Sequence, residues 1–444
     1  IKESVREVGT KFMSVLAKLL ARSIDSAKGI SKEKTIETLK IILPFLLGTK
    51  GLESDAEDVR KFSLTTLLDL VKNTGDSLQT FAPQMVYNLS LLFSSVEPQV
   101  INFLALNSKN YNLDSNLIDS HRRNAVTSSP IFEAIDKLVT MCDDSQVESM
   151  VDYASKAVKK SVGLPSKVAA SHVIILLIKR FGLDMKPYSG KLLKVCMNMF
   201  EDRNEAINLS YAQTFGYLNK VSTMDKSAKY AKKLSENYFN PSKDNSKKVV
   251  GYAIESVLKY APSQFEGIAS SFMPLIFIGS NDVDEVNGKL YDNLWTEASA
   301  TGSGTIKLYL REILDILGSN IKSNDFNMRR TCGKAISIIC SNVDAKIDKK
   351  DVKSILYITI ESLAGRSWDG KELLFEALVD SAIKFKDAVN NDTDTKESIE
   401  NVMKTEISRN NMDYVKKVII PYGKYLETFS ENNMKDNVKA YLSI

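Results

Sequence analysis

The fold is decided by a pattern that first becomes clear at residues 58–75, which read DVRKFSLTTLLDLVKNTG. Apolar side chains recur here at helical spacing, so one face of the segment is apolar and the other polar. The segment closes on Asn73 and Gly75, and a glycine in this place suits the left-handed backbone that ends a helix. These residues predict an amphipathic helix that must pack against another element. On one side of the predicted helix lie Phe62, Leu64, Leu67, Leu68 and Val71.

The same pattern returns through most of the chain, each time as a pair of helices with a period of about 40 residues, which is the period of HEAT and armadillo repeats. The first pair joins residues 36–47 to residues 59–71. A unit of this size cannot bury its own apolar face, so it must stack on its neighbours. The pattern predicts an all-α fold, an α-solenoid of HEAT/ARM-like antiparallel helix pairs. From residue 204 onward the second helices align on anchors at Ile207, Val249, Val286, Met328, Lys371 with Leu373, and Val415.

The periodicity fails between Asn107 and Pro130, where the chain is rich in Asn, Ser and Asp and contains His121-Arg122-Arg123. A polar stretch of this length predicts a loop, a disordered insertion or a break between two arrays. We therefore predict three parts. Residues 1–106 form HEAT-like repeats, residues 107–129 form a polar loop or disordered insertion, and residues 130–444 form a HEAT-like array. A short helix at residues 434–442 ends that array.

Two places in the array make specific local predictions. Residues 165–181 are nearly all apolar and include His172, so they predict a helix of the inner layer with a structural histidine. The turn at Asp202-Arg203-Asn204 predicts an N-cap for the following helix.

Composition limits the kinds of function that the chain can have. The charges of its 59 basic and 55 acidic residues nearly cancel, leaving a net charge of +4. This balance does not by itself indicate nucleic-acid binding. The four cysteines show no metal-type spacing and lie in apolar runs, which favours buried free thiols in a reducing compartment. No run of residues approaches the ~18 apolar residues of a membrane span. The chain starts at Ile1 inside an amphipathic pattern, and we expect an internal portion of a longer intracellular protein.

Residues for catalysis are scarce. The chain has two histidines, His121 and His172, and no motif of a metalloprotease or a serine hydrolase. One segment, residues 365–372 (GRSWDGKE), nearly matches a phosphate-binding loop. Such a loop needs a Ser or Thr after its lysine and a strand before it, whereas Glu372 follows Lys371 and a helical pattern precedes it. We interpret the segment as a turn in which Gly365 ends one helix and Asp369 caps the next.

Several of these turns resemble a known family, the proteasome adapter and scaffold proteins, and they occur in the family's order. The resemblance covers residues 129–386, and before residue 107 it is only to HEAT repeats in general. The most specific stretch is LAGRSWDGKE at residues 363–372, because a helical repeat has little generic reason to carry it. The other stretches are PYSGKL at 187–192, DRN at 202–204, NLWTE at 293–297 and IKLYL at 306–310.

The resemblance implies a non-enzymatic scaffold that bridges the core and regulatory particles of the proteasome, including its ATPase ring, in the cytoplasm and the nucleus. It implies the C-terminal portion of a long HEAT solenoid. From the residues we expect no cofactor, metal, nucleic acid, membrane insertion or small-molecule substrate. Possible partner-contact or family-motif positions are Arg203, Trp295, Arg366, Trp368 and Lys371.

Three alternatives stay open on the sequence. Nuclear transport receptors of the karyopherin type are also built of HEAT pairs, and binding to GTP-loaded Ran would favour that class. An enzyme would be favoured by ATP binding that is lost with Lys371→Ala. A tubulin-binding array is expected to carry Trp and Lys on the turns within its pairs, whereas Trp295 and Trp368 fall at or inside predicted second helices.

Overall fold

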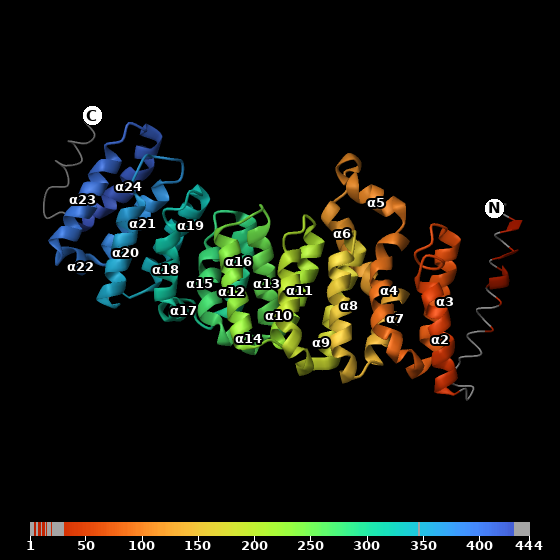
Figure 1. The fold of residues 1–444 in the computed structure, drawn as a ribbon. Helices are drawn as coiled ribbons and strands as arrows, with labels where there is room; N and C mark the ends of the chain where they lie inside the picture. The colour runs from red at the N-terminus through yellow and green to blue at the C-terminus, as the bar shows by residue number, and fades with distance from the viewer. Residues whose placement is uncertain are drawn as a thin grey trace. The chain divides into compact units, whose positions relative to one another are not determined.

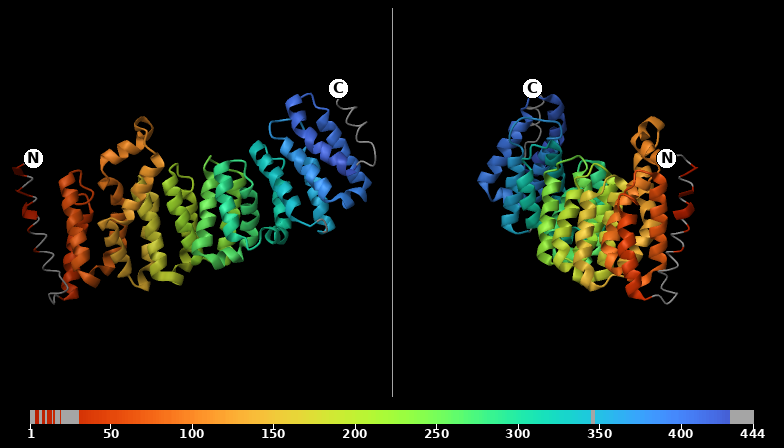
Figure 2. Two further views of the ribbon diagram at one scale, coloured as in Figure 1. Left: turned by 180° about the vertical axis from the view of Figure 1, so that it is seen from behind. Right: turned by 45° about the vertical axis from the view of Figure 1, so that its right-hand side comes forward.

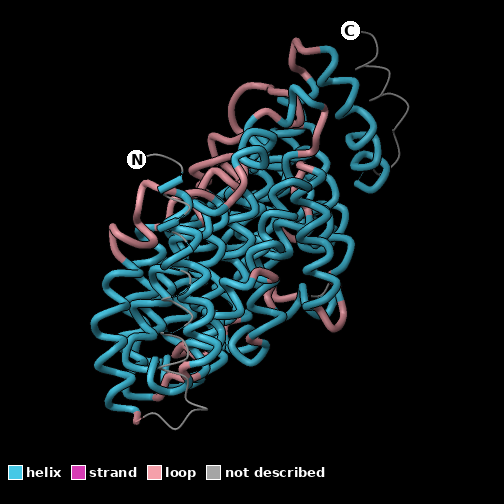
Figure 3. Tube along the Cα trace, turned by 90° about the vertical axis from the view of Figure 1, so that its right-hand side faces the viewer, coloured by secondary structure: helices cyan, strands magenta, loops and turns pink. Residues whose placement is uncertain are grey.

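The computed structural model describes residues 31–344 and 347–429, together with isolated positions between residues 4 and 19. Throughout these residues the regular structure is helical, with no strand (Figures 1 and 3). The chain divides into two compact units, residues 1–227 with 256–264 and residues 228–255 with 265–444. The predicted all-α repeat fold is confirmed.

Unit 1 is a stack of helix pairs in which neighbouring helices lie side by side (Figure 2). Its central element is α9, whose side chains are buried along most of its length, and which contacts α4, α6, α7, α8 and α11. A helix that is apolar all round is stable only when other helices enclose it. The prediction of an inner-layer helix at residues 165–181 is therefore confirmed. The elements are α2 (Lys32–Leu47), α3 (Glu57–Asn73), η2 (Gly75–Phe81), α4 (Ala82–Val96), α5 (Gln99–Leu106), η3 (Ser108–Tyr111), α6 (Ser115–Thr127), α7 (Pro130–Thr140), η4 (Asp144–Gln146), α8 (Val147–Lys160), α9 (Leu164–Phe181), η5 (Gly182–Tyr188), α10 (Ser189–Met199) and α11 (Glu205–Lys220).

Unit 2 repeats the same construction. Its helices α15 and α16 form one antiparallel pair, and α19, α21 and α24 are the second helices of successive pairs that pack on one another. Three helices contain a boundary between the units: α12 (Met224–Phe239), α13 (Ser246–Tyr260) and α14 (Pro262–Gly267). The others are α15 (Ala269–Ser280), α16 (Glu285–Ala298), α17 (Gly302–Leu308), α18 (Leu310–Asn320), α19 (Phe326–Asn342), α20 (Lys349–Ser362), α21 (Glu372–Lys384), α22 (Lys386–Asn390), α23 (Thr393–Ile407) and α24 (Met412–Phe429).

The predicted loop or disordered insertion at residues 107–129 is wrong, because η3 and α6 occupy most of it. Asp114 caps α6 by accepting a hydrogen bond from the backbone N–H of Asn116. The polar residues lie largely on exposed positions of α6, and an arginine, Arg122, occupies an inward position against Glu97. A charged residue in that position interrupts the apolar pattern, so the sequence does not show the helical periodicity of α6. The structure also places its division into units within α12, α13 and α14, and not at the polar segment.

Other predicted features need smaller corrections. The anchor Val286 is 58% exposed, and α16 packs through Tyr291 and Leu294 instead. The helix predicted from residue 369 begins at Glu372, since Gly370 has a φ of +99° that a helix does not allow. The predicted helix at residues 434–442 lies outside the described residues.

No single helix in the described ranges is long and apolar enough to cross a membrane. Residues 75–96 and 99–106 meet such criteria only as a pair of segments bent by 67°. The buried apolar side chains of α4 account for much of that composition.

Candidate protein-binding site

The repeats are joined by ion pairs that recur at a constant spacing. Each pair links a lysine at the start of a second helix to an acid of the next repeat, 35 residues later. Asp202 and Asp282 lie in turns, and Glu406 lies in the last turn of α23. The first joins Lys167 to Asp202 at 2.6 Å in unit 1. The second joins Lys247 to Asp282 at 2.8 Å in unit 2. Their equal spacing follows from the repeat period, because equivalent positions of adjacent units face each other.

A buried tyrosine from the second helix of the next repeat accompanies each of these two pairs. The hydroxyls of Tyr211 and Tyr291 donate to the backbone carbonyls of Lys167 and Lys247. Burial raises the pKa of both phenols well above its usual value, so each stays a neutral donor. The tyrosine and the ion pair together pin one repeat to the next.

The third pair lies deepest. The Nζ of Lys371 donates to Glu406 at 2.9 Å and to the carbonyl of Gly365 at 3.2 Å, and the side chains of Lys371 and Glu406 are 0% and 1% exposed. Arg409 and Tyr414 also donate to Glu406, at 2.5 and 2.8 Å. Burial lowers the pKa of Lys371, and the hydrogen bond and charge of Glu406 oppose that shift. The two cations and the phenol satisfy this carboxylate, as a buried charge requires.

This buried cluster fixes the turn between α20 and α21. Gly365 and Gly370 adopt φ values of +89° and +99°, which L side chains rarely do. Arg409 donates to the carbonyl of Gly365 at 2.6 Å, and Arg330 donates to the backbone carbonyl of Asp369. With its ends held from both neighbouring repeats, the turn presents Arg366 to solvent.

The same turn contributes Trp368, two residues after Arg366, to an aromatic stack with a cation above it. The rings of Phe326 and Trp368 stack at 4.8 Å, and the guanidinium of Arg329 lies 5.6 and 5.9 Å from their centroids. Phe326 is 50% exposed. The indole Nε1 of Trp368 is buried and has no hydrogen-bond partner among the described residues. Stacked aromatic and arginine side chains with exposed area are typical of binding hot spots. We call Phe326, Arg329, Arg366 and Trp368 the aromatic-arginine edge.

The structure brings only some of the predicted positions together. Arg366, Trp368 and Lys371 share one turn, but Lys371 is buried and acts as an anchor. Trp295 lies half-buried in α16, with its ring 5.4 Å from that of Phe277. Arg203 lies exposed between α10 and α11 of unit 1.

Sequence reasoning missed the residues around this turn: Glu406, Arg409, Tyr414, Phe326 and Arg329. A usable signal existed, because Glu406 follows Lys371 at the same 35-residue spacing as the other two pairs.

The resemblance of residues 365–372 to a phosphate loop does not extend to their geometry. Helix α20 precedes the turn in place of a strand. The ammonium of Lys371 is engaged by Glu406 and faces the interior, so it does not point toward a phosphate. Elsewhere in the described ranges no group of three or more His, Cys, Asp or Glu side chains is arranged to hold a metal ion.

The four cysteines are buried, and the predicted structural histidine is half-buried. All four cysteines are free and buried, as predicted, and burial raises the pKa of Cys142 to about 11 and that of Cys332 to about 12. Such thiols are poorly reactive near neutral pH. Burial, with smaller contributions from Arg123 and Lys179, lowers the pKa of His172 to about 4. Its ring packs edge-on against Phe132 at 6.0 Å, which agrees with a structural role.

Comparison with known proteins gives consistent matches over the chain. Residues 78–239 match the family described as "Proteasome adapter and scaffold protein ECM29, HEAT-repeat domain". The "Proteasome component ECM29" of Saccharomyces cerevisiae is 55% identical over 427 residues, which are 96% of this chain and 23% of that protein. The human "Proteasome adapter and scaffold protein ECM29" is 31% identical over 424 residues, which are 93% of this chain and 22% of that protein. The chain thus spans about a quarter of the length of these curated relatives.

Solved structures show only distant likeness. The karyopherin Kap121p, bound to the extreme C-terminus of the phosphatase Cdc14p, covers 97% of this chain with 43% of its own length, at a TM-score of 0.39 and 13% identity. Importin beta covers 94% of this chain with 50% of its own length, at a TM-score of 0.35 and 13% identity. TM-scores and sequence identities this low support no conclusion about function.

Proposed function

This chain belongs to the ECM29 family of proteasome adapter and scaffold proteins, and from that premise we propose that it is a non-enzymatic scaffold that binds the proteasome. It tethers the core particle to the regulatory particle and modulates their assembly, stability or activity. The single observation that carries this proposal is the 55% identity, over 96% of the chain, to a relative named as a proteasome component. That name favours this function over nuclear transport, the other role considered for a HEAT array.

A scaffold of this kind needs no reacting groups of its own. Holding two bodies on one chain raises their effective concentration toward each other. If the chain binds one conformation of the ATPase ring more tightly than another, it also shifts the ring toward that conformation. We further propose that it acts in the cytoplasm and the nucleus.

The contact surface in unit 2 is the aromatic-arginine edge. Arg366 is exposed, and no described residue forms an ion pair with it. The guanidinium of Arg329 lies over the stacked rings of Phe326 and Trp368 and donates to the carbonyl of Ser323. A cation over an aromatic stack, with the exposed Arg366 two residues before Trp368 in the chain, fits an acidic, partly apolar surface on a proteasome subunit. Arg203 in unit 1 is a further exposed contact position, and Trp295 is a half-buried one.

Co-purification with a tagged full-length protein tests both levels of the proposal. We expect the wild type to recover core and regulatory subunits, and Arg366→Glu to reduce that recovery severalfold. The matched control is Lys334→Glu, which reverses an exposed charge on α19. Recovery of neither particle by the wild type would refute proteasome binding. Equal recovery with Arg366→Glu and wild type would refute only the role of the edge.

A further inference from the structure

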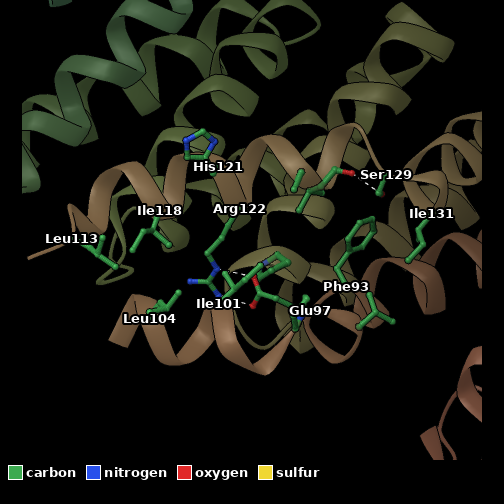
Figure 4. A pocket seen from close by; sticks show the side chains of 15 residues that line it. Phe93, Glu97, Ile101, Leu104, Leu113, Ile118, His121, Arg122, Ser129 and Ile131 are labelled. Carbon is green, nitrogen blue, oxygen red and sulfur yellow. Dashed lines mark hydrogen bonds and ion pairs between the residues drawn. The ribbon is translucent and has the colours of Figure 1, made fainter. Parts of the chain in front are cut away.

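A second surface, in unit 1, lies far along the sequence from the aromatic-arginine edge. An apolar cavity of about 510 Å³ opens between α4, α5, α6 and α7 (Figure 4). Volumes of several hundred Å³ are typical of binding pockets. Leu104 of α5 faces Ile118 of α6 across it. Other apolar side chains in its wall include Phe93, Val96, Ile101 and Val126.

The charged groups in the wall neutralise each other. Arg122 donates through Nε and Nη2 to the two carboxylate oxygens of Glu97, each at 2.7 Å, and both side chains are below 10% exposed. The same guanidinium donates to Asp119 at 2.9 Å and to Asn102 of α5 at 2.8 Å. These bonds tether α5 to α6 and hold the cavity between them. A charged occupant would find Glu97 and Arg122 already paired with each other, so the site suits an uncharged, apolar group.

The apolar surface continues from the cavity over the outside of α5. This helix, QVINFLAL, carries no charge and has no buried residue. On it Val100, Phe103 and Leu106 are 67%, 52% and 85% exposed. A helix with apolar side chains on all sides is normally enclosed by protein. Phe103 packs edge-on against Tyr111 at 6.1 Å, and the outer side of α5 is otherwise the exposed part of this surface.

We propose that α5 and the cavity beneath it dock an amphipathic helix of a partner protein. The docking face of that helix is uncharged, and one bulky apolar side chain fills the cavity while neighbouring turns cover Phe103 and Leu106. A small molecule in the cavity would leave those two side chains in water. A membrane surface is disfavoured because interfacial helices usually carry Lys or Arg, and α5 carries neither. Apolar anchors at helical spacing in a groove are a recurrent mode of recognition.

Site-specific photocrosslinking in the full-length protein tests the proposal. A benzophenone amino acid replaces Phe103, and in the control it replaces Tyr357, which is 65% exposed on α20 of unit 2. A second change, Ala125→Trp, fills the cavity from α6. If that variant loses helicity, Ala125→Met replaces it with a smaller side chain. We expect crosslinks from position 103 to one helical segment with an apolar face, and at least a fivefold lower yield when the cavity is filled.

Each other outcome overturns the proposal. These are no crosslink at position 103, crosslinks to charged loops, crosslinks to a second copy of this chain, or a yield unchanged by Ala125→Trp. A small-molecule adduct seen by native mass spectrometry, or flotation with phosphatidylcholine vesicles that Phe103→Ser abolishes, would assign the surface to another occupant. None of these results depends on the proteasome co-purification with Arg366→Glu, so the two proposals fail separately.

Discussion

Lys371 shows at the scale of one residue how a motif and its environment differ. Its neighbours in the sequence resemble a phosphate loop, yet its ammonium is 0% exposed and bonded to Glu406. A buried ion pair contributes little net stability compared with apolar residues, but removing one partner leaves the other charge uncompensated. The residue is therefore a structural anchor of the turn that carries Arg366.

We predict that Lys371→Met destabilises unit 2 by about 3 kcal/mol, because Glu406 loses a buried cation. Urea denaturation followed by tryptophan fluorescence measures this change, since both tryptophans, Trp295 and Trp368, lie in unit 2. The control is Lys404→Met on α23, where the lysine is exposed. A loss below about 1 kcal/mol for Lys371→Met would contradict the buried pair.

His172 makes the protein sensitive to acid. Burial holds its pKa at about 4 in the folded chain, below the ordinary histidine value of 6.5 that it has in the unfolded chain. Between these values the unfolded chain binds more protons, so stability falls as the pH falls from 6.5 toward 4. We expect this group alone to cost about 2 kcal/mol between pH 7 and pH 5. Urea midpoints of His172→Phe at both pH values should show a smaller loss than the wild type, and His121→Gln tests whether losing the other histidine has the same effect.

At the scale of elements, the close approach of helices limits which residues fit. A side chain at Gly279 of α15 would lie 2.5 Å from the ring of Tyr291, which is fully buried in α16. At Gly423 of α24 a Cβ atom meets nothing within 4 Å. Gly279 thus lies in a close contact between two helices, whereas Gly423 lies where a side chain has room.

We predict that Gly279→Ala destabilises unit 2 by about 1–3 kcal/mol, because the added methyl group overpacks the contact between α15 and α16. Gly423→Ala, the matched change, should be neutral or stabilising by up to about 1 kcal/mol, since alanine favours helix. Thermal or urea denaturation of the two variants checks this pair. A similar loss in both would show that helix propensity, and not packing, decides the effect.

Helix α6 is the element that the sequence pattern did not predict. Its apolar stripe is interrupted by Arg122, and its other residues are mostly those that favour turns. The helix is stable because Glu97, Asp119 and Asn102 satisfy that arginine. Asn102 and Glu97 lie 20 and 25 residues away from Arg122, so no local sequence pattern predicts these contacts.

At the scale of the whole molecule, the chain is two units whose repeats contact mainly their neighbours. In such arrays stability is close to a sum of local terms, and cooperativity need not extend over the full length. We predict that urea transitions by tryptophan fluorescence, which reports unit 2, and by circular dichroism, which reports both units, have different midpoints. Lys371→Met should shift the midpoint of the fluorescence transition more than that of the circular dichroism transition. Coincident transitions in both proteins would contradict independent units.

The amino-acid sequence by itself determined the helices, their pairing into repeats of about 40 residues and the buried cysteines, because these depend on side-chain spacing within a few turns. It also carried the family motifs at residues 363–372. Tertiary structure alone decided that Lys371 faces Glu406, that residues 115–127 form α6, and that α5 overhangs an apolar cavity. The physical reason is that burial of a charge, and exposure of an apolar face, are set by residues that folding brings together from distant parts of the chain.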